Sequence, residues 1–197
     1  MSGVVVIDHG AGNYASVAYA LARLGVDCER SADPRRVRQA SHVILPGVGA
    51  AGSAMRHLRA SGVSDVLPGL TQPVLGICLG MQLLHDTSEE DGTSCLGIVP
   101  GRATRLPGGD GLRSPHMGWN TLCVTGVSPL TAGLDPTEFV YFVHSYAVAP
   151  GPDCIAQTTY GATFSALVSR RNFHGAQFHP ERSGKAGARV LANFLAL

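Results

Sequence analysis

The stretch Val74-Leu75-Gly76-Ile77-Cys78-Leu79-Gly80-Met81-Gln82-Leu83-Leu84 decides the fold. Its first four residues form a short apolar run, which is typical of a strand buried on both faces of a sheet. The residues after Gly80 have the spacing of an apolar helix face. A strand that enters a helix through G-x-C-x-G is the cysteine counterpart of a nucleophile elbow, in which the nucleophile lies on a tight turn. The stretch therefore predicts an α/β fold with Cys78 at the carboxyl end of a strand.

The first half of the chain repeats this alternation. Three short runs predict strands, at Val4–Ile7, 26–29 and His42–Leu45. Three helical patterns follow these strands, at about 17–24, 33–40 and 53–60. Strands that alternate with helices in this way favour a mostly parallel sheet flanked by helices.

The second half has a different pattern. From residue 96 to about 168, segments alternate between apolar and polar residues, with little helical periodicity. We expect an additional antiparallel sheet or extension beside the parallel one here, with one strand at 139–143, and a final helix at about 187–195. The 197 residues show no internal repeat, so we expect one domain that covers residues 1–197.

Composition argues against several classes of protein. The net charge is only +1 and Lys and Arg are scattered, so we expect no nucleic-acid partner. No apolar run approaches the roughly 20 residues that cross a bilayer, and the first residues lack the pattern of a signal peptide. Five cysteines, none in a C-x-x-C pair, favour neither a disulfide framework nor a zinc site. We expect a cytoplasmic protein with no membrane association, metal or cofactor.

A cysteine nucleophile needs a base, and the base needs a partner that holds its tautomer. His179 follows the apolar segment 176–178 and precedes Pro180-Glu181. Proline stiffens this turn, so the two polar side chains can point to one side. We predict that Glu181 accepts a hydrogen bond from the imidazole that His179 presents to Cys78. The blander alternatives are a small buried cysteine and a surface histidine beside a helix start.

The other ionisable residues are not predicted to take part in catalysis. Seven histidines lack an adjoining carboxylate in a rigid turn and are interpreted as surface residues: His9, His42, His57, His85, His116, His144 and His174. The run Glu89-Glu90-Asp91 is predicted to be a solvated surface.

Gly76–Gly80 with Gln82, and His179-Pro180-Glu181, resemble the class I (triad) glutamine amidotransferases, over the whole chain. Within this family, five further stretches resemble the glutaminase subunits of imidazole glycerol phosphate synthases. They are 7–13, 45–49, 115–120, 141–146 and 179–183, and the segment His116-Met-Gly-Trp-Asn120 discriminates best. The resemblance implies a flavodoxin-like α/β fold.

The resemblance also implies roles for residues. Cys78 would attack the carboxamide of glutamine, with His179 and Glu181 completing the triad. The backbone N–H groups of Leu79 and of Val48 or Gly49 would stabilise the oxyanion. Four residues would line the glutamine pocket: Gly47, Gln82, Ser145 and Tyr146. Relatives often have Tyr and Met where this chain has His9 and Ala11, and usually Lys at the position of Arg182.

A partner is implied as well. Free ammonia in neutral water is mostly ammonium, which is not nucleophilic, so a glutaminase that only released it would waste glutamine. The resemblance implies a (β/α)8-barrel cyclase that consumes ammonia together with a phosphorylated ribulosyl aminoimidazole carboxamide nucleotide. Its products are imidazole glycerol phosphate and an aminoimidazole carboxamide ribotide. By analogy, the residues facing this barrel are Asn13, Met117, Trp119, Tyr141, Arg182 and Lys185. Ordinary core packing is the alternative for Trp119 and Tyr141.

Three other functions stay open at this point. The chain resembles, less closely, glutaminase subunits that feed pyridoxal phosphate or anthranilate synthesis, and pull-down with each synthase distinguishes these. A non-catalytic scaffold would not be labelled at Cys78 by a glutamine analogue. A cysteine hydrolase of peptides or esters would show more esterase than glutaminase activity in the full complex.

Overall fold

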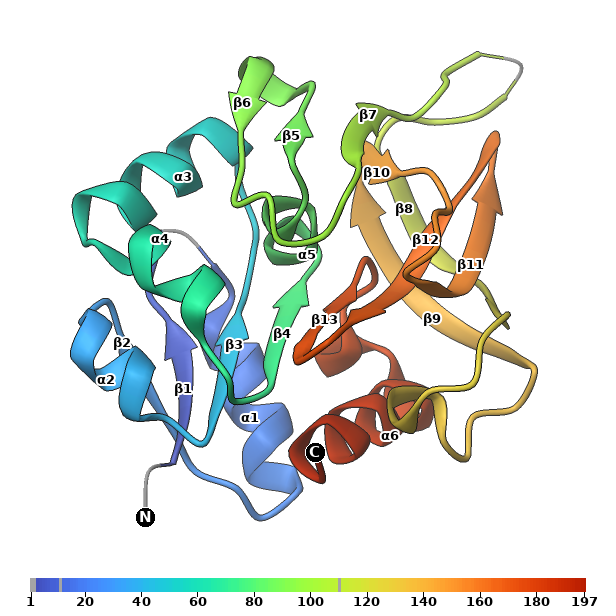
Figure 1. Cartoon of the computed structure of the whole chain (residues 1–197). Coiled ribbons are helices and arrows are strands. Elements are labelled where there is room, and N and C mark those ends of the chain that lie inside the picture. Colours follow the sequence, from blue (N-terminus) through green and yellow to red (C-terminus); the bar gives the residue numbers. More distant parts are fainter. Residues whose placement is uncertain (1–2, 11, 110) are drawn as a thin grey trace.

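The computed structural model describes residues 3–10, 12–109 and 111–197, so Ala11 lies outside the described residues. Five strands form the parallel half of a nine-stranded sheet (Figure 1): β1 (Val4–Ile7), β2 (Cys28–Ser31), β3 (His42–Leu45), β4 (Val74–Ile77) and β13 (Phe173–Ala176). Alternate residues of β1 enter different cores, because successive side chains of a strand point to opposite faces. Val4 and Val6 pack on one face, and Val5 and Ile7 on the other.

Antiparallel strands extend the same sheet without a break. They are β12 (Ala162–Arg170), β11 (Cys154–Tyr160), β8 (His116–Val124) and β9 (Thr137–His144). The complete order is β2-β1-β3-β4-β13-β12-β11-β8-β9. The predicted antiparallel strands are therefore present, and β13 joins them to the parallel half.

A second, four-stranded sheet lies above the carboxyl ends of the parallel strands (Figure 1). Its strands, in order, are β10 (Tyr146–Val148), β7 (Arg102–Arg105), β5 (Thr87–Ser88) and β6 (Thr93–Ser94). It is mixed, because β5 and β7 are parallel while the other two pairs are antiparallel.

Helices cover both faces of the parallel half. One face packs against α1 (Tyr14–Arg23) and α6 (Gly184–Leu195). The other packs against α2 (Pro34–Gln39), α3 (Ala51–Ala60), α4 (Val63–Val66) and α5 (Leu79–Leu84). Four short 3₁₀ turns complete the elements: η1 (Leu67–Gly69), η2 (Glu90–Gly92), η3 (Pro129–Thr131) and η4 (Pro180–Arg182). In the described part of the chain, no helix combines the length and apolarity needed to cross a bilayer.

Several predicted boundaries differ from the structure. The strand expected at 26–29 is Cys28–Ser31, because Gly25 and Val26 still bond back to α1. Helix α1 begins at Tyr14 rather than at residue 17, and α6 begins at Gly184 rather than at residue 187. Helix α3 begins at Ala51 rather than at residue 53. There the Ala51 N–H donates to the Glu90 carboxylate at 2.7 Å, a contact distant in sequence.

Candidate active site

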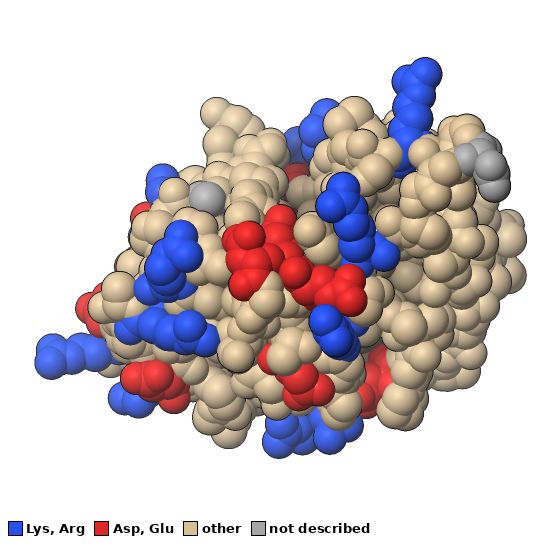
Figure 2. All heavy atoms as spheres, turned by 90° about the horizontal axis from the view of Figure 1, so that it is seen from above, with Lys and Arg blue, Asp and Glu red and all other residues tan. Residues whose placement is uncertain are grey.

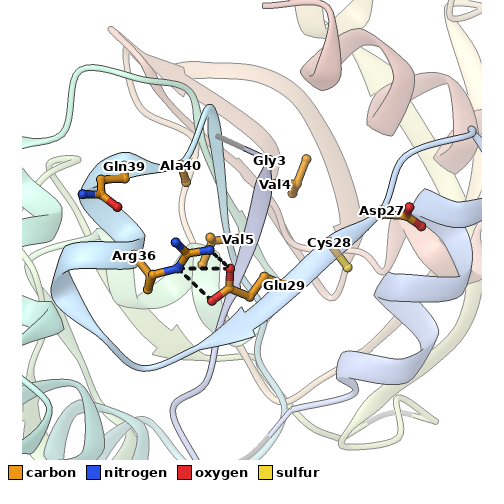
Figure 3. Close-up of a pocket in the computed structure, with 9 residues that line it drawn as sticks. All are labelled: Gly3, Val4, Val5, Asp27, Cys28, Glu29, Arg36, Gln39 and Ala40. Carbon is orange, nitrogen blue, oxygen red and sulfur yellow. Dashed lines mark hydrogen bonds and ion pairs between the residues drawn. The ribbon is translucent and has the colours of Figure 1, made fainter. Parts of the chain in front are cut away.

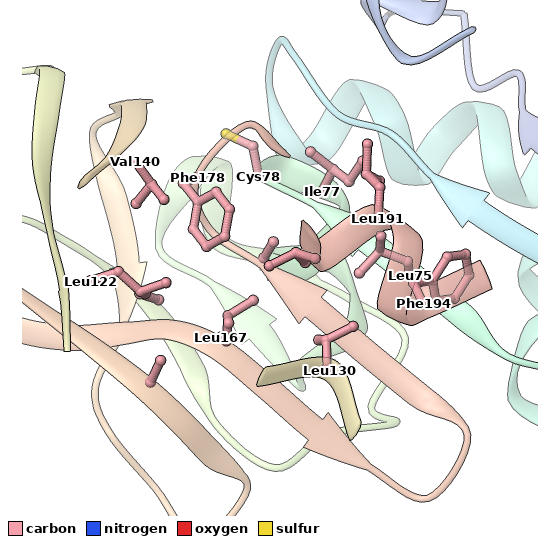
Figure 4. Close-up of a cluster of buried hydrophobic side chains, with 14 of the residues drawn as sticks. Leu75, Ile77, Cys78, Leu122, Leu130, Val140, Leu167, Phe178, Leu191 and Phe194 are labelled. Atoms are coloured by element: carbon pink, nitrogen blue, oxygen red, sulfur yellow. The ribbon is translucent and has the colours of Figure 1, made fainter. Parts of the chain in front are cut away.

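Cys78 lies on a strained turn between β4 and α5. Its φ of 53° and ψ of −108° belong to a region that non-glycine residues rarely adopt. Its N–H donates to the carbonyl of Ala176 at 2.7 Å, so β13 holds the turn in place. The side chain is 6% exposed, and Figure 4 shows its sulfur at the border of the apolar cluster that includes Ile77 and Phe178. This geometry is that of the predicted nucleophile elbow.

Two glycines allow the surrounding backbone to approach this turn. A Cβ on Gly80 would collide with the carbonyl oxygen of Leu45 at the end of β3. A Cβ on Gly47 would collide with the peptide between Leu79 and Gly80. The strip at residues 47–49 therefore lies directly against the start of α5, and a side chain at either glycine would separate them.

His179 and Glu181 occupy the turn that contains η4. The His179 Nδ1–H donates to Glu181 Oε1 at 2.8 Å, and both side chains are almost fully buried. The His179 N–H donates to the carbonyl of Tyr141 at 3.0 Å. Ser183 Oγ donates to the carbonyl of His179 at 2.7 Å and accepts from the Tyr141 N–H at 2.9 Å. The turn is thus fastened to β9 from both ends.

The environment of His179 favours its charged form. Burial opposes the charge, but the nearby Cys78 sulfur and the Glu181 carboxylate outweigh burial and raise the pKa of His179. Because Nδ1 is bonded to Glu181, Nε2 is the nitrogen available to Cys78, and it makes no hydrogen bond within the described residues in the resting geometry. The arrangement can hold a thiolate next to an imidazolium.

A cavity of about 270 Å³ opens beside Cys78. Its walls include all eight residues predicted for the oxyanion hole, the nucleophile and the glutamine pocket: Gly47, Val48, Gly49, Cys78, Leu79, Gln82, Ser145 and Tyr146. His179 and Glu181 do not line it. Four further residues do, namely Glu90, Pro115, Val143 and His144.

Glu90 corrects the prediction that residues 89–91 form a solvated surface. Glu89 and Asp91 are exposed, but Glu90 is half-buried and lines the cavity. Its Oε2 caps the first N–H of α3, which follows the strip at 47–49. No local pattern could predict this role, since Glu90 and Ala51 are 39 positions apart.

Five histidines that were expected at the surface are buried: His9, His85, His116, His144 and His174. His144 Nδ1–H donates to the Tyr146 carbonyl at 2.8 Å, and its Nε2 lies 3.0 Å from His116 Nδ1. Burial lowers the pKa of His116 and of His144 to about 4 each, so both rings are neutral near pH 7. Among the described residues, no group of three or more His, Cys, Asp or Glu side chains could hold a metal ion.

Two buried amides connect the cavity to the Cys78 sulfur. Gln82 Nε2 donates to the Tyr146 carbonyl at 2.8 Å and to Gln177 Oε1 at 3.1 Å. Gln177 Nε2 lies 3.7 Å from Cys78 Sγ. Gln177 was predicted only as part of an apolar strand, and the contact with sulfur has no signal in the sequence.

Only some of the residues predicted to face a partner lie close together. Strands β8 and β9 pair Trp119 with Tyr141, and the Arg182 guanidinium lies 4.5 Å from the centre of the Tyr141 ring. Met117 and Trp119 are 63% and 56% exposed, so core packing is wrong for Trp119. Lys185 lines a shallow hollow with Arg182. Asn13 caps α1 by accepting from the Ser16 N–H, and no described contact joins it to this group.

A larger cavity, of about 620 Å³, lies at the amino ends of β1 and β2 (Figure 3), whereas Cys78 follows the carboxyl end of β4. Two of its charged side chains, Arg36 and Glu29, bond to each other. Of these two cavities, only the one beside Cys78 includes the predicted nucleophile and the strip at 47–49.

Comparison with known proteins agrees with this geometry. The family model described as glutamine amidotransferase class-I matches residues 5–197. A solved structure called "Crystal structure of glutamine amidotransferase" superposes with a TM-score of 0.77 at 20% identity, over 98% of this chain and 98% of that one. The structure of PurLQS from Thermotoga maritima gives a TM-score of 0.74 at 18% identity, over 98% and 97%. These two structures support the fold alone.

The chain belongs to the class-I glutamine amidotransferase family and is an enzyme of that class. Two of its relatives are imidazole glycerol phosphate synthase subunits HisH. The one from Vibrio cholerae serotype O1 is 48% identical over 98% of this chain and 98% of the relative. The one from Xanthomonas axonopodis pv. citri is 49% identical over 99% and 98%. Within the family the chain thus groups with the HisH subunits, which confirms the predicted role of a glutaminase subunit in histidine biosynthesis.

Proposed function

We propose that Cys78, His179 and Glu181 form the catalytic triad that releases ammonia from glutamine. The observation that carries this proposal is the strained turn at Cys78 together with the 2.8 Å hydrogen bond between His179 and Glu181. The thiolate attacks the carboxamide carbon, and the carbonyl becomes an oxyanion. His179 then gives its proton to the nitrogen, and the C–N bond breaks. Ammonia departs, and the acyl group remains bound to Cys78 as a thioester. Water, deprotonated by His179, hydrolyses the thioester to glutamate.

The oxyanion would be held by backbone N–H groups. Leu79 is the first residue of α5, where N–H groups have no partner within the helix. The second donor would come from Val48 or Gly49, because the strip at 47–49 packs against Leu79. Each such donor is typically worth about 3 kcal/mol of the activation barrier.

The other end of glutamine would be recognised by polar groups of the cavity. Gln82 uses both hydrogens of its amide nitrogen internally, so its Oε1 is left to accept from the substrate. Ser145 and Tyr146 would contribute backbone groups. The free Oε1 of Glu90 is suited to the ammonium group of an amino acid. Figure 2, seen from above, shows acidic side chains near the middle of the molecule's upper face, with Lys and Arg side chains beside them.

A cyclase subunit would consume the ammonia, because the relatives named above are subunits of imidazole glycerol phosphate synthase. We propose a 1:1 complex with a (β/α)8-barrel cyclase, formed through the exposed face of β8 and β9. Met117, Trp119 and Tyr141 supply apolar surface, and Arg182 and Lys185 supply charge. An exposed aromatic next to an arginine is the usual composition of an interface hot spot. Asn13 would lie at the edge of this interface.

We further propose that the isolated chain is a poor glutaminase until the cyclase and its nucleotide bind. The strip at 47–49 contains two glycines and has its anchors at its ends, where Pro46 accepts from His9 and Ala51 donates to Glu90. Rotation of the peptide at Val48 would therefore form or abolish one oxyanion donor. Fast glutamine turnover that is independent of the partner would contradict this part of the proposal.

Glutamine hydrolysis by the chain, with and without the cyclase and its nucleotide, tests the proposed function. Wild type should be strongly stimulated, Cys78→Ala should be inactive, and Cys28→Ala should behave as wild type because Cys28 begins β2 and lines neither the cavity beside Cys78 nor the β8–β9 surface. A diazo-oxo-norleucine label should map to Cys78 by mass spectrometry. Labelling of another cysteine, or full activity of Cys78→Ala, would refute the proposal.

Binding to the cyclase tests the proposed surface separately. Trp119→Ala should weaken the complex by about thirtyfold, the effect of a typical hot spot, without changing the label at Cys78. Val127→Ala is the control, because Val127 is fully exposed but lies outside the strand pair. Equal affinity of the two variants would place the interface elsewhere.

We also propose a cytoplasmic location. All five cysteines are free thiols, which suits a reducing compartment. Quantitative thiol titration of protein extracted under anaerobic conditions checks the state of these cysteines in the cell.

A further inference from the structure

We propose that Gln177 is a thiolate-stabilising residue, and that Gln82 is the positioning residue that holds it toward Cys78. This inference rests on the proposed function, since it needs Cys78 as nucleophile. It adds a hydrogen-bond donor to the sulfur and connects that donor to the glutamine cavity.

Gln177 is placed rigidly beside the sulfur. It follows β13 directly, its side chain is 0% exposed, and its N–H donates to the Ala166 carbonyl at 2.9 Å. Its Nε2 lies 3.7 Å from Cys78 Sγ, within the range of N–H···S hydrogen bonds. A fully buried amide that contacts a sulfur on a strained turn has little freedom to turn elsewhere.

The direction of each amide follows from chemistry. The carbonyl of Tyr146 can only accept, so the atom of Gln82 that approaches it at 2.8 Å must be the amide nitrogen. The same nitrogen lies 3.1 Å from the Gln177 side chain, which must therefore present its oxygen. Since Oε1 of Gln177 faces Gln82, its Nε2 faces Cys78. Gln82 thereby fixes an N–H donor on the sulfur.

This donor discriminates between the two states of the sulfur. The thiol can donate its proton to the Val143 carbonyl, which lies 3.7 Å from Sγ. The thiolate cannot donate, and it gains instead from the N–H of Gln177, because hydrogen bonds to a charged acceptor are about twice as strong as neutral ones. Gln177 therefore favours the reactive anion. Gln82 also lines the cavity, so a bound glutamine that engages its Oε1 would hold the pair of amides in this arrangement.

Alkylation of Cys78 by iodoacetamide across pH tests the inference, with Cys123 in the same chain as an internal reference. Gln177→Met keeps the side-chain volume but removes the donor. We expect alkylation of Cys78 to be about tenfold slower at pH 7 and its pH profile to move to higher pH. Gln82→Met should move the profile in the same direction, and the two changes together should be less than additive. Gln72→Met is the matched control, an amide that donates to the Val37 carbonyl away from the cavity.

A structural role alone would not move the pH profile relative to Cys123. If Gln177→Met folds as wild type and alkylates Cys78 with an unchanged profile, the inference is overturned. An unchanged profile in Gln82→Met overturns the positioning role. If Gln177→Met fails to fold, Gln177→Glu takes its place, and we expect an even slower reaction because a carboxylate repels the thiolate.

The wild-type protein separates failure of the inference from failure of the proposed function. If diazo-oxo-norleucine labels Cys78 but the Gln177 variants react normally, the inference alone is wrong. If wild-type Cys78 is neither labelled by that analogue nor alkylated faster than Cys123, the proposed function itself fails, and the inference fails with it.

Discussion

Two groups of buried histidines prefer opposite charge states. His179 bonds to the Glu181 carboxylate and lies near Cys78, and its pKa is raised. His116 and His144 bond to each other and to neutral groups, and burial lowers the pKa of each to about 4. All three rings are more than nine-tenths buried. Burial alone therefore does not decide the charge of a histidine here; the neighbouring Cys78 and Glu181 do so for His179.

Removal of His179 should have the largest effect. We expect His179→Asn to lower kcat for glutamine by roughly 10⁴-fold, because proton transfer to the leaving nitrogen is lost. Glutamine hydrolysis in the presence of the cyclase measures this loss. His116→Gln is the control, because it removes an equally buried ring that bonds to no carboxylate. A comparable loss of kcat in this variant would contradict a catalytic role that is specific to His179.

Removal of the Glu181 carboxylate should make the charge state of His179 more like that of His116 and His144, which are neutral. Glu181→Gln keeps the shape but not the charge, so the pKa of His179 should fall and kcat should drop roughly 10²–10³-fold. A raised pKa in the folded state stabilises the fold fully below the unfolded value of 6.5, and this contribution is lost as pH rises through the folded value. Urea titrations across alkaline pH should show a smaller decline for Glu181→Gln than for wild type.

The neutral pair should make the fold sensitive to acid. Between pH 6.5 and about 4, unfolded histidine binds a proton that folded His116 and His144 exclude. Stability therefore rises with pH in this window, and acidification should cost on the order of 3 kcal/mol of unfolding free energy for each ring. Urea titrations from pH 7 to 4 should show a shallower loss for His116→Gln, while His57→Gln, an exposed histidine, should match wild type.

The smallest effect should come from the serine that fastens the base. Ser183→Ala removes the two hydrogen bonds by which its hydroxyl links the His179 carbonyl to the Tyr141 N–H, and we expect a loss of about 1–2 kcal/mol in unfolding free energy. kcat should fall only several-fold, because Pro180 still shapes the turn. Ser128→Ala is a suitable control, since this serine also bonds to backbone but lies at η3. If kcat fell as far in Ser183→Ala as in Glu181→Gln, the position of His179 rather than its charge would govern its contribution to catalysis.

The parallel half of the sheet could be predicted closely from the sequence. Strands Val4–Ile7, His42–Leu45 and Val74–Ile77 occur at the predicted residues, because strands covered on both faces need unbroken apolar runs. The turn at Cys78 was predictable for a related reason: the glycines that flank it are required by the close approach of the backbone. The contact between His179 and Glu181 is local and was predictable too.

Contacts between distant segments could not be predicted in the same way. Strands β5 and β6 have two residues each, too few to show a period. Glu90 reaches Ala51, and Gln177 reaches Cys78, across gaps that no local pattern spans. The prediction that His116 and His144 lie at the surface was wrong, because tertiary packing buries them and the local sequence does not distinguish a buried histidine from an exposed one.

Strand β13 pairs with β4 on one side and β12 on the other, and the turn with His179 follows it. A nascent chain emerging from the ribosome would display Cys78 long before these final residues exist. Until they arrive, the parallel and antiparallel halves of the sheet are not joined, and Cys78 lacks its contacts with Ala176 and Gln177. The surroundings of this sulfur are therefore complete only when the last part of the chain has been made.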